Sequence, residues 1–432
     1  MTTPTPGTSV EVAKARKDES PSSKDKEGQG LMARLGRWLE RDPAPDQAGI
    51  RPLFTARLTD VAANRLAKQW CARYTAAEGK ERRSLLAVLA QASAALEPRD
   101  DQGLRLFRRL YAQADSLHLL VDLRADMLKW RNQVAGLSVL ERELEGLLST
   151  WFDVGMLELR RITWDSPASL LEKLIQYEAV HEIRSWEELR HRVADHRRCF
   201  AFFHPRMDDI PLIFVEIAFA PQMAGNVQVL LDPQVPAGDS NKAKWAIFYS
   251  ISNTQAGLRG ISFGNFLLKR VIDELVSEMP KLKSFATLSP IPGFVDWLAK
   301  QDGKALQPLL HDKADKQQAM DDPDAGRKWV ERLQSAAAAQ ASDAAQRTGQ
   351  RLAVHYLKSM KNGQPLDPVA RFHLGNGARI ERVNWAADCS AKGMAQSCGL
   401  MVNYVYELDQ LDDNLAQLAA GKPKTGLNLR WL

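Results

Sequence analysis

The chain has only four cysteines in 432 residues, and their spacing matches neither a disulfide framework nor a zinc site. Cys71, Cys199, Cys389 and Cys398 are therefore predicted to be free thiols in a reducing compartment. The sequence leaves open a single redox or interchain disulfide. No apolar run approaches the about 20 residues that span a membrane. We expect a cytoplasmic protein that does not contact membranes.

The sequence also lacks a concentrated charge of either sign. The formal net charge is +5, and lysine and arginine are mixed with acidic residues along most of the chain. No basic run with interleaved aromatic residues appears, which argues against a nucleic-acid partner. No HExxH, paired CxxC or carboxylate triad indicates a metal. Residues 1–30 have no apolar signal core and carry several acids, so they are predicted to be a disordered tail.

Residues 31–150 show helical periodicity throughout and no strand pattern, which predicts an all-α domain. Its apolar faces carry no recognisable chemistry, so a scaffold or oligomer contact is the expected role. The predicted helices that matter for the fold are Leu58–Ala77, Glu81–Leu96, Leu104–Ala112, Leu117–Val134 and Leu137–Leu148.

Residues 151–432 have mixed α/β character. Two helices open this domain, and four strand-like runs follow. Turn residues separate these runs, which favours a largely antiparallel set of strands. The helices are Leu170–Tyr177 and Trp186–Asp195, and the strands are Arg198–His204, Leu212–Ala220, Val227–Leu231 and Trp245–Ile251. Residues 301–350 are predicted to be a helical excursion from the sheet. Two late strands, Ala378–Trp385 and Gly399–Leu408, and a terminal helix, Leu411–Ala420, complete the domain.

The stretch Lys244–Phe294 combines a buried strand, a glycine-containing turn, an amphipathic helix and a second strand. Strands followed by such a unit are the order of an acetyltransferase-like α/β fold, which is a fold-level analogy. The turn places backbone N–H groups at a helix N-terminus, where they suit a phosphate. Its glycines equally fit close packing or a positive φ, so spacing alone does not decide between these roles.

Ser289 ends the second strand of this unit and is followed by Pro290 and Pro292. The prolines hold the chain extended and remove two competing donors, which suits a fixed hydroxyl that binds a carboxylate or carbonyl. A turn serine that satisfies its own backbone is the alternative. No GxSxG motif surrounds Ser289, so an acyl-enzyme is not indicated.

His373 falls in the last turn of a short predicted helix, Val369–Leu374, which Asp367-Pro368 starts and Gly375 ends. The helix dipole there favours the protonated ring by up to ~2 kcal/mol, which would raise its pKa by roughly 1.5 units. A histidine near neutrality is a competent proton donor. A packed or capping histidine remains the alternative from sequence alone.

Four long strings resemble one known family. They are FYSISNTQAGLRGISFGNFLLKRV, SFATLSPIPGF, PVARFHLGNGARIERVNWAADCS and SCGLMVNYVY. They are similar to malonyl-CoA decarboxylases, in order from about Trp151 to Tyr406, and the similarity continues more weakly into the helical half.

The resemblance implies that Ser289 and His373 are the catalytic pair and that Tyr406 orients the histidine, with Asn376 as a further helper. It also implies that the turn binds CoA through Gln255, Gly257, Arg259, Gly260, Ile261, Ser262, Phe263, Gly264 and Asn265. Mammalian members carry a glutamate where this chain has Ser262, so no role for that carboxylate transfers to this chain.

The expected function is therefore decarboxylation of malonyl-CoA to acetyl-CoA and CO2, without a cofactor. The resemblance also implies a homo-oligomer, either a dimer or a tetramer. Two alternatives stay open on the sequence: an acyl-CoA N-acyltransferase on the same fold, and a non-catalytic CoA-binding scaffold whose working surface is the helical domain.

Overall fold

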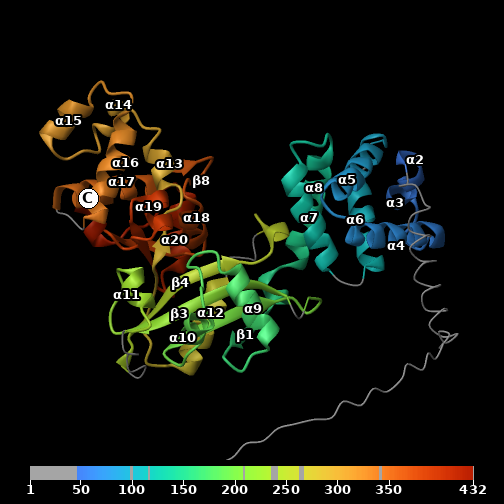
Figure 1. Cartoon of the computed structure of the whole chain (residues 1–432), viewed down its shortest axis with the longest axis horizontal. Coiled ribbons are helices and arrows are strands. Elements are labelled where there is room, and N and C mark those ends of the chain that lie inside the picture. The colour runs from blue at the N-terminus through green and yellow to red at the C-terminus, as the bar shows by residue number, and fades with distance from the viewer. Residues whose placement is uncertain are drawn as a thin grey trace, which may run out of the picture.

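The computed structural model describes residues 46–97, 101–114, 117–207, 210–234, 242–261, 267–339 and 343–431. A helical region comes first, a mixed sheet follows it, and a second group of helices lies beside the far end of the sheet (Figure 1). The predicted disordered tail, residues 1–30, lies outside the described residues.

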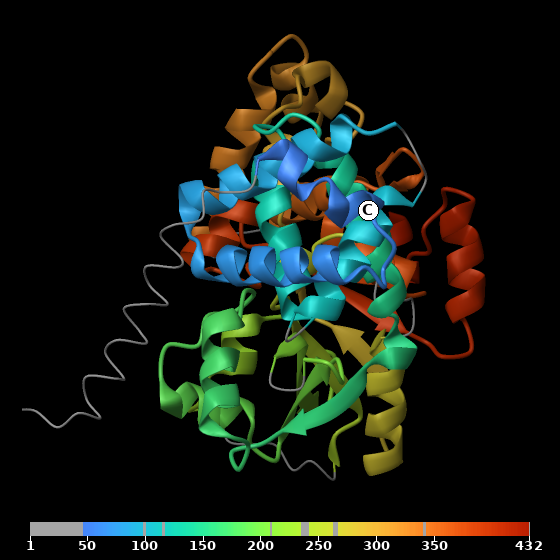
Figure 2. The same ribbon diagram turned by 90° about the vertical axis from the view of Figure 1, so that its right-hand side faces the viewer.

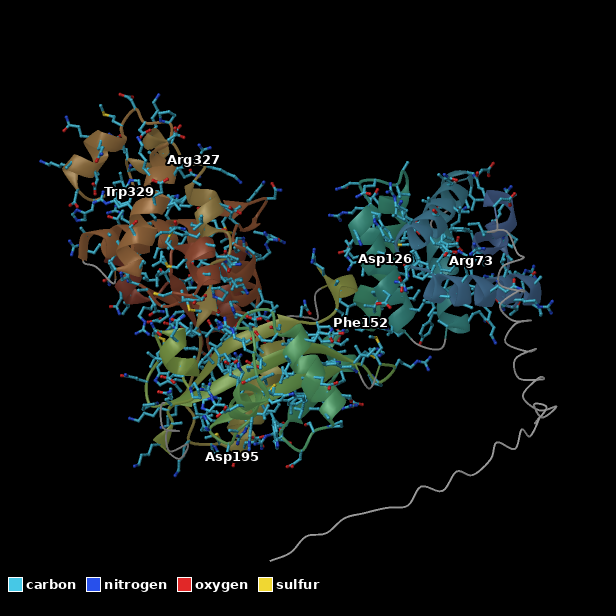
Figure 3. The ribbon with its side chains drawn as sticks, in the orientation of Figure 1. Arg73, Asp126, Phe152, Asp195, Arg327 and Trp329 are labelled. Carbon is cyan, nitrogen blue, oxygen red and sulfur yellow. The ribbon has the colours of Figure 1, made fainter. Side chains whose placement is uncertain are left out.

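The N-terminal region is helical up to residue 151, as its periodicity predicts. Its helices are α2 (Gln47–Ile50), α3 (Pro52–Thr55), α4 (Val61–Ala76), α5 (Gly79–Ala94), α6 (Gln102–Gln113), α7 (His118–Trp130) and α8 (Leu137–Trp151). Asp126 on α7 joins three of them, because it accepts a hydrogen bond of 2.7 Å from Tyr74 on α4 and pairs at 3.3 Å with Arg82 on α5 (Figure 3). Phe152, directly after α8, is fully buried and packs against the His204 ring, so it joins the helices to the sheet.

The sheet has eight strands in the described residues and runs in the order β1-β2-β3-β4-β5-β10-β6, with β9 paired to β10. The strands are β1 (Glu158–Ile162), β2 (Arg197–Phe203), β3 (Pro211–Ala220), β4 (Trp245–Asn253), β5 (Ser284–Thr287), β6 (Ser289–Pro290), β9 (Arg379–Asn384) and β10 (Met401–Tyr406). Strands β1 to β4 are antiparallel, and β5 then pairs parallel to β4. This is the predicted acetyltransferase-like order, except that the sequence analysis did not identify β1 and placed a strand at Val227–Leu231, where there is none.

Helices cover both faces of the sheet, and Figure 2 shows them on opposite sides. Helices α9 (Ala168–Tyr177) and α10 (Trp186–Arg192) pack on one face, where Leu171, Leu174 and Leu189 bury against Phe203 and Phe214. Helix α12 (Leu267–Glu278) packs on the other face through apolar residues that recur at three- and four-residue steps. Successive side chains along a strand point to opposite faces of the sheet, so one strand contributes to the apolar core on each face.

The C-terminal helices lie beside the β9–β10 end of the sheet (Figure 1). They are α13 (Phe294–Leu298), α14 (Gly303–Leu306), α15 (Lys313–Ala319), α16 (Ala325–Ala338), α17 (Asp343–Lys358), α18 (Pro368–Gly375), α19 (Ala391–Ser397) and α20 (Leu411–Ala419). Helices α14 to α17 begin within residues 301–350, the range of the predicted helical excursion. A small hairpin, β7 (Met360–Lys361) with β8 (Gln364–Pro365), precedes α18. In the described parts of the chain, no helix has the length and apolarity to cross a membrane.

One predicted strand is wrong. Val227–Leu231 forms the short helix α11, in which the Asn226 side chain accepts a hydrogen bond of 3.0 Å from the Val229 N–H. An asparagine N-cap stabilises a helical turn locally, and this outweighs the strand propensity of the valines.

Helix α18 depends on its N-cap, which gives a stability prediction. The Asp367 carboxylate accepts hydrogen bonds from the N–H groups of Val369 at 2.9 Å and Ala370 at 2.8 Å. We expect Asp367→Ala to lower the free energy of unfolding by about 1–2 kcal/mol, and Asp367→Asn, which keeps an acceptor, to lose much less. Urea denaturation of the full chain measures both. Equal losses in the two variants would contradict the capping role.

Candidate active site

The site forms where two parallel strands separate. The β4–β5 pairing runs from Trp245↔Ser284 to Phe248↔Thr287, and a last bond of 2.9 Å joins the Leu288 N–H to the Phe248 carbonyl. Beyond this point β6 pairs with β10. Pro290 has no N–H to continue a ladder, and β4 has a bulge where Glu216 pairs with Ser250. The two chains therefore diverge and leave a gap in the sheet.

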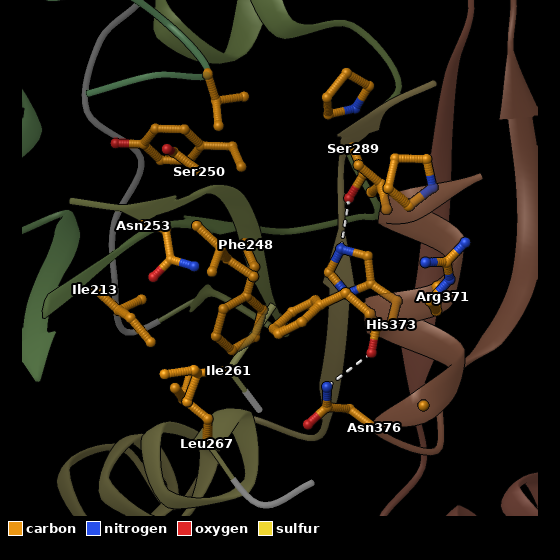
Figure 4. A pocket seen from close by; sticks show the side chains of 18 residues that line it. Ile213, Phe248, Ser250, Asn253, Ile261, Leu267, Ser289, Arg371, His373 and Asn376 are labelled. Carbon is orange, nitrogen blue, oxygen red and sulfur yellow. Dashed lines mark hydrogen bonds between the residues drawn. The ribbon is translucent and has the colours of Figure 1, made fainter. Parts of the chain in front are cut away.

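A cavity of about 370 Å³ occupies this gap. The outer half of β4 forms one wall, and β6 with helix α18 forms the other (Figure 4). Ile261 and Leu267, the first residue of α12, line its end. Residues far apart in the sequence thus meet around one mostly apolar space, with a few polar groups at its wall, which is typical of a ligand site.

Three of the predicted residues form a continuous chain of hydrogen bonds at the cavity wall. The Ser289 Oγ lies 3.1 Å from the His373 Nε2, and the His373 Nδ1 lies 2.8 Å from the Tyr406 hydroxyl (Figure 4 shows the first contact). Ser289, His373 and Tyr406 are all at most 5% exposed. The structure therefore brings together a hydroxyl, an imidazole and a phenol from β6, α18 and β10.

Thr287 extends this chain and was missed by the sequence analysis. Its Oγ1 accepts a hydrogen bond of 2.8 Å from the Ser289 hydroxyl and one of 3.1 Å from the Tyr404 N–H. Its side chain is fully buried. Residues two apart on an extended chain face the same side, and this spacing between Thr287 and Ser289 is the signal that could have identified it.

The predicted protonation of His373 is wrong for the free protein. Burial of the ring lowers the pKa of His373 from 6.5 to about 3, because the charged form loses its hydration. The sequence shows that His373 lies at a helix end, which favours the charged ring. It does not show that the ring is stacked on Tyr404, with 4.6 Å between the ring centroids. His373 is therefore neutral at pH 7.

The bonding pattern assigns a tautomer to this neutral ring. Because the Ser289 hydroxyl donates to Thr287, the hydrogen between Ser289 and His373 belongs to the ring Nε2. The Nδ1 is then an acceptor, and the Tyr406 hydroxyl donates to it. Tyr406 thus holds the ring with its Nε2–H directed at the cavity wall.

The predicted CoA-binding turn is only partly at the cavity. Ile261 lines it, whereas the Gln255 side chain bonds to the Pro211 carbonyl at 3.3 Å. Gly257 is buried against α7, and Arg259 and Gly260 are exposed, the latter with φ of +82°. Ser262, Phe263, Gly264 and Asn265 lie outside the described residues.

A residue of α18 and the C-cap residue of this helix also lie on the cavity wall. Asn376, a predicted helper of the histidine, donates from its Nδ2 to the Phe372 carbonyl at 2.7 Å instead of to the His373 ring. Arg371, which the sequence analysis did not identify, donates to the Pro365 carbonyl from its Nε and Nη2. Its guanidinium brings a positive charge to the cavity wall, and this charge would attract an anionic ligand.

Family models match almost the whole described chain. The malonyl-CoA decarboxylase N-terminal domain matches residues 61–152, and the C-terminal domain matches residues 155–423. The chain belongs to the malonyl-CoA decarboxylase family. The resemblance described in the sequence analysis is thereby confirmed.

Individual family members agree with this assignment. The crystal structure of malonyl-CoA decarboxylase from Cupriavidus metallidurans is 51% identical, with a TM-score of 0.80 over 91% of this chain and 99% of that chain. The enzyme of that name from Rhodopseudomonas palustris is 35% identical, with a TM-score of 0.75 over 90% and 100% of the two chains. The rat protein named malonyl-CoA decarboxylase, mitochondrial, is 38% identical, and the match covers 72% of this chain and 66% of the rat protein. This chain thus spans about two thirds of that relative, and its predicted cytoplasmic location stays a prediction.

The lowered pKa of His373 predicts the pH dependence of the free protein. Between pH 6.5 and about 3 the unfolded chain binds a proton at this position that the folded chain does not, so the stability due to this group is fully present above pH 6.5 and is lost as the pH falls. We expect the His373 ring resonances to show no titration between pH 5 and 8 in a full-length isotope-labelled sample. An NMR titration that compares wild type with His373→Asn makes this measurement. A midpoint near 6.5 would contradict the burial argument.

The hydrogen bond between Ser289 and Thr287 leads to a second prediction, on the rate of turnover. Thr287→Val keeps the shape but removes the acceptor for Ser289, and a net hydrogen bond of about 1 kcal/mol corresponds to a fivefold to tenfold effect. We expect kcat in the malonyl-thioester reaction proposed below to fall by about that factor, with KM little changed, and Thr287→Ser to restore most of the loss. Steady-state kinetics on samples of equal folded fraction tests this. A Ser variant as impaired as the Val variant would argue for a packing role instead.

Proposed function

We propose that this chain decarboxylates malonyl-CoA to acetyl-CoA and CO2. The observation that carries the proposal is the Ser289–His373–Tyr406 chain of hydrogen bonds at the wall of the cavity, in a protein of the malonyl-CoA decarboxylase family. These are the residues that the family resemblance assigns to catalysis.

The chemistry requires a place for one electron pair and a source for one proton. When the bond between C2 and the carboxylate breaks, its electron pair moves toward the thioester carbonyl and forms an enolate, while CO2 leaves. A proton then adds to C2 to give the acetyl group. Because the thioester carbonyl itself accepts the electron pair, we also propose that the reaction needs no resident cofactor.

Ser289 is the proposed donor to the malonyl group. Its hydroxyl is fixed by Thr287 at one side and by His373 at the other. A rotation of this hydroxyl from Thr287 toward the cavity would direct it at the malonyl carboxylate or the carbonyl oxygen. Once directed at the substrate, such a donor stabilises the developing negative charge and is worth about 10²–10³ in rate.

His373 is the proposed proton donor to C2. In the free protein the ring is neutral because no anion offsets its burial. The malonyl carboxylate brings a negative charge to the cavity, and a nearby opposite charge favours the protonated ring. The same negative charge passes to the enolate when CO2 leaves. The imidazolium would therefore be stabilised throughout and would give its Nε2 proton to C2.

The turn after β4 is the proposed CoA-binding element. Its exposed Arg259 can pair with a phosphate by charge-assisted hydrogen bonds, and Ile261 contacts the cavity that would hold the acyl end. The predicted homo-oligomer is retained as part of this proposal.

The decisive experiment uses the full-length, metal-chelated protein with malonyl-CoA. Acetyl-CoA and CO2 are followed by chromatography and mass spectrometry for wild type, Ser289→Ala and His373→Asn. We expect stoichiometric products from wild type and a decrease in kcat of about 10²–10³ in each variant, because each loses a group that acts in the transition state. Affinity for acetyl-CoA, measured by calorimetry, is expected to change little.

Other outcomes would replace the proposal. Loss of acetyl-CoA affinity equal to the loss of kcat would remove the division of roles between the cavity wall and the turn. Acetyl-CoA binding without turnover of malonyl-CoA would favour the scaffold. An acylated amine as the product would favour the N-acyltransferase.

A further inference from the structure

The helical region directly holds the turn that precedes α12. Arg124 on α7 is 1% exposed, and its Nη1 donates to the carbonyls of Gly257 at 2.7 Å and Arg259 at 2.8 Å. These carbonyls lie more than 130 residues further along the chain and flank the end of the 3-10 segment η3 (Ala256–Leu258). One side chain thus holds two carbonyls of this turn.

Two glutamates on α8 complete the surroundings of this guanidinium. Glu141, itself 3% exposed, lies 3.0 Å from both the Nε and the Nη2 of Arg124, and Glu145 lies 3.3 Å from the Nη2. Glu141 and Glu145 are four residues apart and therefore share one helix face. A planar group with five donors can satisfy the glutamates and the turn at once, whereas a lysine ammonium has three donors at a single point.

The turn also packs on α7 without any side chain between them. A Cβ built on Gly257 would lie 1.8 Å from the Val121 carbonyl oxygen. Val121 and Arg124 are three residues apart on the same face of α7. Gly257 therefore serves close packing against the helical region, which is one of the alternatives that its spacing left open.

The opposite side of the same turn reaches the active site. The Ile261 N–H donates to the Leu258 carbonyl at 3.1 Å, and Ile261 lines the cavity that contains Ser289 and His373. Arg259, whose carbonyl Arg124 holds, is exposed and does not line that cavity. A displacement of Arg259 would therefore move the proposed phosphate contact and leave Ser289 and His373 in place. Gly257, which contacts α7, and Ile261, which lines the cavity, are thus four residues apart.

We propose that Arg124 is a positioning residue for CoA recognition, and that the helical region thereby sets the affinity for the nucleotide part of the substrate. The inference rests on the proposed function in assigning a CoA thioester to the cavity. Arg124 lies on a different domain from Ser289 and His373 and touches neither of them. It acts through the turn, so it should affect binding of CoA far more than the chemical step.

A truncated substrate separates this role from a general structural one. Malonyl-N-acetylcysteamine carries the same malonyl thioester but lacks the phosphates and the adenosine. We expect Arg124→Lys to raise KM for malonyl-CoA by roughly tenfold, because buried hydrogen bonds from a charged group are lost, and to leave kcat within about threefold. Its kcat/KM for malonyl-N-acetylcysteamine should equal that of wild type.

Arg109 provides a matched control inside the helical region. It is also 1% exposed, and it donates to the carbonyls of Ala56 and Arg57 at 2.6 and 2.8 Å and to Asn64 at 2.8 Å, away from the turn. Arg109→Lys should disturb helix packing to a similar degree without raising KM. Gly257→Ala should reproduce the KM effect of Arg124→Lys, since its new methyl group would force the turn off α7.

Several results would overturn the proposal. They are an unchanged KM for malonyl-CoA in Arg124→Lys, an equal rise in Arg109→Lys, and an equal loss with both substrates. Calorimetry with acetyl-CoA tests the same contact without turnover: weaker binding in Arg124→Lys but not in Arg109→Lys supports it, and equal binding in wild type and Arg124→Lys refutes it. Absence of decarboxylation by wild type would refute the proposed function and leave this binding comparison valid.

Discussion

The arrangement of this domain depends on where the parallel hydrogen bonding between β4 and β5 stops. Strands β4 and β5 share four residue pairs and then separate, because Pro290 offers no N–H and β4 bulges near Ser250. If the ladder continued, β4 and β6 would close the sheet and no cavity would exist between them. The missing hydrogen bonds are thus a structural requirement of the site.

Strand β10 keeps the sheet intact across this gap. It pairs with β5 through Val405 and Tyr406, and with β6 through Met401 and Val402, so it holds the two short strands in line. Tyr406 reaches the His373 ring from the same strand, and the Tyr404 N–H binds Thr287. Strand β10, which bridges the gap in the sheet, therefore also positions the reactive groups. A shift of β10 would displace Ser289.

Local patterns predicted much of this arrangement, and long-range contacts account for most of what they missed. Periodicity identified the helices and most strands, and the Asp367-Pro368 start located the helix that carries His373. The resemblance supplied Ser289 and Tyr406. The helix at Val227–Leu231 was missed because its cap at Asn226 was not recognised, and β1 was missed because ELRRI carries three charges in five residues. Nothing near Arg124 in the sequence indicates that it binds carbonyls over 130 residues away.

The ionisation of His373 shows how burial can reverse a local expectation. The dipole of α18 favours the protonated ring by up to ~2 kcal/mol, or about 1.5 pKa units. Burial acts in the opposite direction and is the larger effect, since it brings the pKa from 6.5 to about 3. A neutral ring fits an empty apolar cavity, whereas the proposed chemistry needs the ring protonated at both nitrogens, so that a neutral imidazole remains after the Nε2 proton passes to C2. The substrate is the one partner that can reconcile the two, because its carboxylate supplies the negative charge that the buried ring lacks. Binding of substrate and protonation of the catalytic group would then be a single linked event.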